Sequence, residues 1–236
     1  MTVTKTVRPR PAAPVEASSA PKAVQSRMDP ADRRQQILDQ AIDFFATHGL
    51  NAQTRALAQA CGISQRLLYR YFPTKDALLL EVYRAAIAGP FKAIWISELS
   101  DRSIKIEDRL LLFYEDYFKT IFNGRWLRLF MHSSLANGQM APDYISDVVV
   151  RVLDLIAIEV AAEQHVALPN DKAIVREICW GLHGGLSHFA LRKHLYRFPQ
   201  AVAEQNVIAA QIALFLGGFK TAIETLAPRE MDLIQK

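Results

Sequence analysis

Polar and basic side chains alternate with apolar ones in residues 54–72, which read TRALAQACGISQRLLYRYF. The apolar and aromatic members recur at spacings that direct them to one shared core, and they are Leu57, Cys61, Ile63, Leu68 and Tyr71. The outward set contains no acid and consists of Arg55, Gln59, Gln65, Arg66 and Arg70. An ordinary solvated helix face mixes acids with bases. The pattern therefore favours a surface that contacts the phosphates and base edges of DNA.

Two small residues in this stretch fit a pair of short helices that cross at a steep angle. Such a pair needs a small residue at the point of contact and a residue that accepts positive φ in the turn. Ala58 meets the first requirement and Gly62 the second. The stretch is thus predicted to be a helix-turn-helix.

The residues that follow extend the pattern, since Pro73 stops the second helix and Thr74 opens another whose first turn carries Lys75. From about residue 33 to 80 the chain resembles the TetR family of one-component bacterial repressors. The matching positions are Gly49, Leu57-Ala58, Cys61-Gly62-Ile63-Ser64, Leu68-Tyr69-Arg70-Tyr71-Phe72, Lys75 and Leu78. The resemblance implies an all-α, TetR-like fold: a three-helix DNA-binding head and a C-terminal helical domain for effector binding and dimerisation. It also implies a homodimeric repressor of a palindromic operator.

The sequence departs from the family pattern at the start of each reading helix. Ala52 and Gln53 stand where Thr or Ser usually begins the first one, which leaves Thr54 or Asn51 as the expected cap. Arg66 and Leu67 replace the usual small residue and Thr in the second. The docking mode of the family is therefore implied, but its base preferences are not.

The predicted DNA contacts fall into two groups. Those at helix starts or with long hydroxyl side chains should position the head on phosphates, and those in the first turn of the second helix should read bases. Arg66 is expected to bind guanine O6 and N7, with a phosphate contact as the alternative. The full set is Thr54, Arg55, Ser64, Gln65, Arg66, Leu67, Tyr69, Arg70, Tyr71 and Lys75.

Three regions are predicted along the chain. Residues 1–29 carry five basic and two acidic residues, a net charge of +3, among four prolines, which indicates a disordered basic arm or linker. Residues 30–76 form the DNA-binding head, whose first helix starts at Asp29-Pro30 and ends at Gly49. Residues 77–236 form the second domain. Glycine and proline breaks divide it into helices at 91–100, 106–122, 125–136, 142–165, 171–197 and 200–226.

The last two helices are apolar on more than one face, and a single chain of this size has little interior for both. Dimerisation through a four-helix interface would bury them, whereas a single-chain core is the alternative. The residues predicted for this interface are Gly181, Gly184, Gly185, His188, Ile208, Ile212, Phe215 and Phe219.

Aromatic residues are dense in the middle helices and predict either ordinary core or the wall of an effector cavity. The predicted pocket residues are Phe113, Tyr117, Phe118, Trp126, Phe130, His132, Tyr144 and His183. Because no carboxylate pair accompanies them, we expect a small apolar or aromatic effector rather than a sugar.

The composition indicates a cytoplasmic protein, with two cysteines, no secretory segment and no run of eighteen apolar residues. The sequence contains no Gly-rich phosphate loop and no H-E-x-x-H, C-x-x-C or G-x-S-x-G motif, so we expect neither an enzyme nor a cofactor. We also expect no membrane partner. The alternative is a helical ligand-binding or architectural DNA-binding protein without effector-regulated release.

Overall fold

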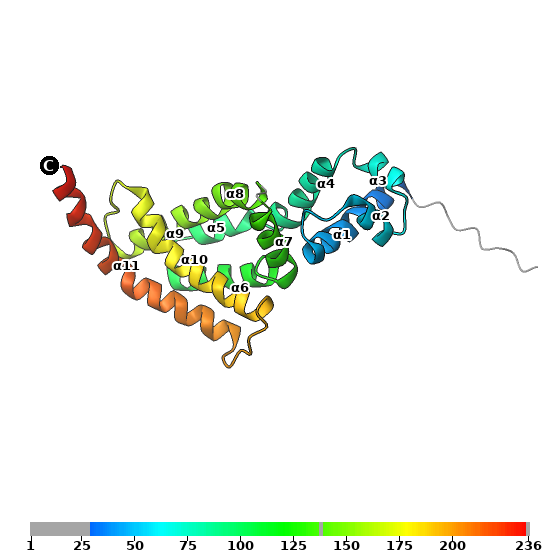
Figure 1. Cartoon of the computed structure of the whole chain (residues 1–236). Coiled ribbons are helices and arrows are strands. Elements are labelled where there is room, and N and C mark those ends of the chain that lie inside the picture. The colour runs from blue at the N-terminus through cyan, green and yellow to red at the C-terminus, as the bar shows by residue number, and fades with distance from the viewer. Residues whose placement is uncertain (1–28, 137–138, 235–236) are drawn as a thin grey trace, which may run out of the picture.

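The computed structural model describes residues 29–136 and 139–234, with side chains up to residue 225, and in these ranges the chain contains helices and loops but no strand. The all-α prediction is therefore confirmed. The predicted basic arm lies outside the described residues, apart from Asp29. A small head of α1 to α3 stands at one end of an elongated molecule, and α4 joins it to the larger helical body (Figure 1).

The head consists of α1 (Pro30–His48), α2 (Thr54–Ala60) and α3 (Gln65–Tyr71). Asp29 caps α1 by accepting the Ala31 N–H at 2.7 Å, and Pro30 occupies the first helical position, as predicted. Gly49 ends the helix at φ +80°, and Gly62 turns the chain between α2 and α3 at φ +63°. The head core is formed by side chains that are almost fully buried: Ile37, Phe45, Leu57, Leu68 and Phe72.

The connection between head and body changes its helical geometry. Helix α4 (Lys75–Val82) runs directly into η1 (Tyr83–Ala88), a π-helical turn closed by the Gly89 N–H bonding to the Arg84 carbonyl at 2.9 Å. Pro90 follows and has no N–H with which to continue the helix. The predicted break at Gly89-Pro90 is confirmed, and the π turn is a feature that hydrophobic periodicity does not reveal.

The body contains α5 (Ile94–Ser100), α6 (Ile106–Thr120), α7 (Gly124–Leu135), α8 (Met140–Tyr144), η2 (Ile145–Val149), α9 (Val150–Gln164), α10 (Lys172–His194) and α11 (Glu204–Ile234). Helix α11 packs on α10 and α6, and α10 packs on α9. The predicted helix 142–165 corresponds to α8, η2 and α9, which follow one another without a loop. The expected end of the last helix near residue 226 is wrong, because α11 continues through Pro228 to Ile234. A proline can be accommodated in a helix by the loss of one hydrogen bond and a bend.

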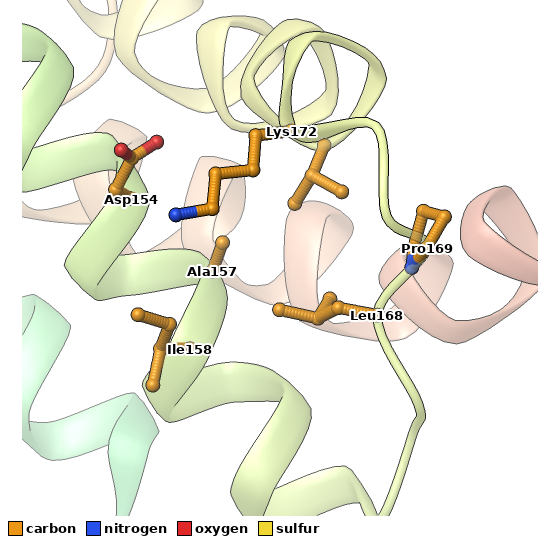
Figure 2. A pocket seen from close by; sticks show the side chains of 7 residues that line it. Asp154, Ala157, Ile158, Leu168, Pro169 and Lys172 are labelled. Carbon is orange, nitrogen blue, oxygen red and sulfur yellow. The ribbon is translucent and has the colours of Figure 1, made fainter.

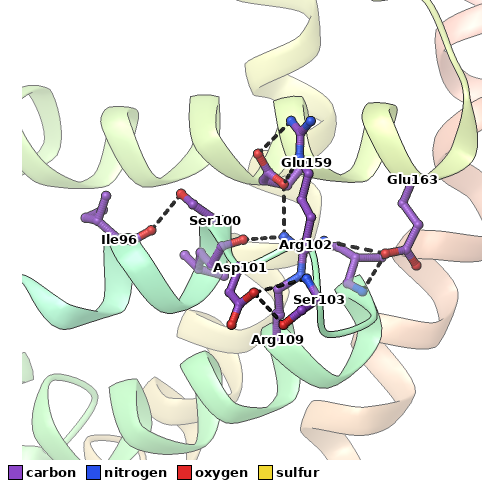
Figure 3. A network of polar contacts seen from close by, with 10 residues as sticks. Ile96, Ser100, Asp101, Arg102, Ser103, Arg109, Glu159 and Glu163 are labelled. Atoms are coloured by element: carbon purple, nitrogen blue, oxygen red, sulfur yellow. Dashed lines mark hydrogen bonds and ion pairs between the residues drawn. The ribbon is translucent and has the colours of Figure 1, made fainter.

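A buried ionic cluster fixes three helices of the body to each other (Figure 3). Arg109 of α6 pairs with Glu159 of α9 at 2.9 Å, and Arg102 in the loop after α5 pairs with the same carboxylate at 2.9 Å. Glu163 accepts the Ile106 N–H at 2.7 Å and so caps α6 from a neighbouring helix. The cluster therefore sets how α5 and α6 lie on α9.

Candidate DNA-binding interface and effector cavity

The second helix of the helix-turn-helix presents a basic surface. Arg66 and Arg70 of α3 are exposed, as is Arg55 of α2, and none of the three takes part in an ion pair with the described residues. Ser64 caps α3 by accepting the Leu67 N–H at 3.2 Å, which places Arg66 in the first helical turn. These guanidinium groups are available for an anionic partner.

Thr54 does not have the role that the sequence suggested. The N-cap of α2 is Gln53, which makes no side-chain capping bond, so the expectation of Thr54 or Asn51 as the cap is wrong. The Thr54 hydroxyl is buried, lies 2.9 Å from the Tyr69 hydroxyl and accepts a hydrogen bond from Gln65 Nε2 at 3.1 Å. These three side chains hold α2 and α3 together, and the Thr54 hydroxyl is engaged within the head.

Lys75 is likewise held by the protein. Its ammonium donates to the Ala52 carbonyl at 3.0 Å and is half-buried, so it ties the start of α4 to the loop before α2. Tyr71 and Leu67 are also half-buried, whereas Tyr69 remains 37% exposed. The structure thus separates the predicted contacts into braces of the head and free basic side chains, the latter being Arg55, Arg66 and Arg70.

The body contains a cavity of about 230 Å³, and the residues that line it lie between 117 and 191 in the sequence, well after the head. Its wall comes from α6, α7, α8, η2 and α10, and it consists of Tyr117, Phe122, Trp126, Leu127, Phe130, Met131, Tyr144, Ile145, Val149, Trp180, His183, Ser187 and Leu191. Trp126 and Phe130 stack with their ring centroids 4.6 Å apart. Burial lowers the pKa of His183 to about 4, so this imidazole is neutral at neutral pH.

Comparison with known proteins identifies the head. Residues 37–82 match the family model described as bacterial regulatory proteins, tetR family. This stretch therefore carries the DNA-binding domain of the tetR family. The resemblance seen in the sequence is confirmed, and the chain is a DNA-binding transcription regulator rather than an enzyme.

Solved structures of TetR-like regulators share the fold of most of the chain. A TetR-like transcriptional regulator from Rhodococcus sp. RHA1 is 20% identical, with a TM-score of 0.60 over 81% of this chain and 100% of that one. A putative TetR-family regulator from Mesorhizobium loti MAFF303099 is 16% identical, with a TM-score of 0.57 over 81% of this chain and 98% of that one. At these identities the likeness establishes the fold alone.

Some of the predicted pocket residues line the cavity and others do not. Five of them line it, namely Tyr117, Trp126, Phe130, Tyr144 and His183. The other three do not line it. Phe113 packs edge-on against Trp95. Phe118 packs against Phe122 and Phe189. His132 lies next to Gly49, where an added Cβ would come within 3.4 Å of the His132 Nδ1. His132 therefore belongs to the contact between α7 and the head.

Several cavity residues were missed by the sequence prediction. Trp180, Ser187 and Leu191 lie on α10 three, four and eight positions from His183, which places them on the same helical face. That spacing was a usable signal. Ile145 and Val149 lie in η2, whose geometry the sequence did not predict.

The predicted dimer residues on α11 face the chain's own core. Ile208, Ile212 and Phe219 are fully buried against the body, and Phe215 is 9% exposed, so their assignment to a dimer interface is wrong. A Cβ on Gly185 would come within 2.8 Å of the side-chain Oε1 of Gln211 of the same chain, so Gly185 faces α11 of its own chain. Space around Gly181 and Gly184 is open, and His188 is exposed.

A second hollow of about 90 Å³ lies between α9 and the loop that leads into α10 (Figure 2). Asp154, Ile158, Leu168 and Lys172 are among the residues around it, and none of the predicted site residues lines it. Asp154 is already held by Arg176 through a 2.6 Å ion pair. The larger aromatic cavity is therefore the candidate effector site.

Proposed function

We propose that this regulator is a homodimeric repressor that binds a palindromic operator through α3 and is released by a small apolar or aromatic effector. The proposal rests above all on the free arginines of the helix-turn-helix, because unpaired guanidinium groups on a reading helix match the phosphates and guanine edges of a major groove. The family supports repression, and the aromatic cavity supports control by a ligand.

The outer face of α11 supports dimerisation. The segment Glu204–Thr225 has a mean hydropathy of 1.4 and is long enough to cross a membrane by length and composition, yet only 22% of it is buried in the chain. Its large residues face inward, while its outer face carries exposed small or apolar residues: Ala209, Ala210, Ala213, Leu214, Gly217 and Gly218. A second copy of this helix, together with exposed Gly181 and His188 of α10, would cover that face.

Trp126 gives the cavity a direct contact with the connection to the head. Its ring lines the cavity, and its indole N–H donates to the Ile87 carbonyl in η1 at 3.2 Å. Arg125, the preceding residue, pairs with Asp43 of α1 at 2.7 Å. A ligand that moves α7 would thus shift both the connector and the head, and by linkage operator binding would weaken the ligand in return.

The first test separates base reading from phosphate contact. Arg66→Ala should cost about 1 to 3 kcal/mol of operator binding and relax the preference at one base pair per half-site. Arg55→Ala is the matched control, because an arginine on the first helix faces the backbone and should weaken all sequences alike. Binding-site selection and salt-dependent titration measure both. If selection with Arg66→Ala returns the parent motif at uniformly lower affinity, Arg66 contacts only phosphate.

The second test concerns the contact between the cavity and the connector. Trp126→Phe keeps an aromatic ring but removes the donor to Ile87, so the amides of η1 should exchange about two- to tenfold faster. Trp180→Phe also alters the cavity wall but has no described bond to η1, and it should leave those amides unchanged. Hydrogen exchange measured by mass spectrometry compares the exchange rates of the η1 amides in both variants with those in the parent. Equal protection of η1 in the parent and Trp126→Phe would remove this residue from the coupling.

A further inference from the structure

Among the residues that the structure describes, no ionised group lines the aromatic cavity. Of its described residues, those with polar side-chain atoms are two tyrosines, two tryptophans, one serine and one histidine, and the histidine is neutral. An isolated carboxylate or ammonium would lose its hydration there and gain no opposite charge, which is a large cost. The occupant should therefore be uncharged.

His183 can donate a hydrogen bond to that occupant. The Tyr114 hydroxyl is buried, and its described hydrogen-bond partner is His183 Nδ1 at 3.5 Å. Burial raises the pKa of Tyr114 far above its usual value, so the hydroxyl keeps its hydrogen, and among the described residues Nδ1 is the acceptor within reach of it. A neutral imidazole carries a single hydrogen, which must then be on Nε2. No hydrogen bond from Nε2 to a described residue satisfies it.

The tyrosine pair at the same cavity has a second free hydrogen. The hydroxyls of Tyr117 and Tyr144 lie 3.1 Å apart, and burial raises the pKa of both, that of Tyr144 to about 12. Only one hydrogen is used between two hydroxyls, so whichever tyrosine donates, the hydrogen of the other remains. Ser187 adds none, because its hydroxyl already donates to the Gly184 carbonyl at 2.9 Å.

The shape of the cavity sets the size of the occupant. At about 230 Å³ it exceeds the roughly 150 Å³ of an engineered apolar cavity that holds benzene. The stacked rings of Trp126 and Phe130 present a flat apolar wall. A planar molecule of two fused rings matches this space and surface.

We infer that the effector is a neutral, two-ring aromatic compound that carries a carbonyl or similar acceptor, which receives hydrogen bonds from His183 Nε2 and from the Tyr117–Tyr144 pair. The inference rests on the proposed function, because it names the ligand class of the same cavity. A cation of the same shape is disfavoured although aromatic walls attract cations, since the two free hydrogens present their positive ends to the occupant.

Four probes of similar size test the inference on the full chain by isothermal titration calorimetry: 1-tetralone, naphthalene, 2-naphthoate and N-methylquinolinium. 1-Tetralone should bind about two- to tenfold more tightly than naphthalene, which has no acceptor, and at least tenfold more tightly than the anion or the cation. Comparable binding of either charged probe would overturn the inference, and so would the failure of all four to bind.

Variants then identify the donors. His183→Phe and, independently, Tyr117→Phe with Tyr144→Phe should each weaken 1-tetralone about two- to tenfold and leave naphthalene unchanged. The matched control is Tyr196→Phe, which removes the hydroxyl of a tyrosine that is 63% exposed and outside the cavity. If 1-tetralone binds all of these variants as it binds the parent, the inference is wrong.

The inference and the proposed function fail in different ways. Operator affinity is measured by fluorescence anisotropy with and without saturating 1-tetralone. If 1-tetralone binds as expected but the operator dissociation constant is unchanged, the ligand class stands and regulated release is overturned.

Discussion

Leu214→Glu is expected to convert the proposed dimer into monomers and to weaken operator binding by about 10² to 10⁴. Leu214 is 72% exposed at the centre of the small, uncharged outer face of α11. A carboxylate there would have to be buried between two copies without a partner, which an interface does not tolerate. Each head alone would then contact only one half-site. Sedimentation velocity and fluorescence anisotropy measure the two effects.

Leu112→Glu is the matched control, because Leu112 of α6 is 59% exposed on a different helix. It should leave both the assembly and the operator affinity unchanged. Sedimentation of the parent as a monomer at micromolar concentration would contradict dimerisation itself. A dimeric Leu214→Glu would place the interface elsewhere on the chain.

The comparison of the two faces of α11 explains what the sequence could and could not predict there. The 3.6-residue period revealed an apolar helix with more than one apolar face, but periodicity does not tell which face meets the chain's own core. Ile212 and Phe215 fill that core, so placing Glu at either should destabilise the monomer rather than separate a dimer. Size distinguishes the two faces, since the bulky residues other than Leu214 lie inward and the alanines and glycines between residues 209 and 218 lie outward.

The head was more predictable because its requirements are local. The positive φ at Gly62, the Asp29 cap and the glycine stop at Gly49 each depend on a few neighbouring residues. The errors in the head concern side chains held across space. Lys75 is bound to Ala52 and Thr54 to Tyr69, which are 23 and 15 positions away in sequence.

The cavity was only partly predictable for a related reason. Phe113 and Tyr117 are four residues apart on one face of α6, yet Phe113 packs on Trp95 of α5 and only Tyr117 reaches the cavity. A cavity is the space that packing leaves unfilled, so it depends on how all the surrounding helices are placed. The sequence shows which faces are aromatic but not where they fail to meet.

The ionic cluster of α6 and α9 should make the body sensitive to the loss of either partner alone. Glu159→Gln leaves Arg109, whose side chain is 2% exposed, with a neutral partner in place of its closest carboxylate. Breaking a buried ion pair on one side typically costs about 3 to 5 kcal/mol of unfolding free energy. Chemical denaturation of the parent and of Glu159→Gln measures this loss of unfolding free energy. Glu107→Gln, on the exposed side of α6, is the control and should have little effect.

Replacing both partners should cost far less than replacing one. In the double variant Arg109→Met with Glu159→Met no buried charge remains unpaired, and exposed Arg102 can turn to solvent. A double-mutant cycle that gives additive losses would show that the two side chains do not depend on each other, contrary to the structure.

The pH dependence of stability provides an independent measure of the same carboxylate. Hydrogen bonds from Arg102 and then Arg109 lower the pKa of Glu159 from its ordinary value of 4.5. A depressed folded-state pKa means that the stabilisation is fully present above about pH 4.5 and is lost as the pH falls through the lowered value. The difference in unfolding free energy between the parent and Glu159→Gln should therefore be constant near neutrality and shrink in acid. A difference that stays constant down to pH 3 would show that the pKa of Glu159 is the same in the folded and the unfolded chain, so that the two arginines do not favour its charged form.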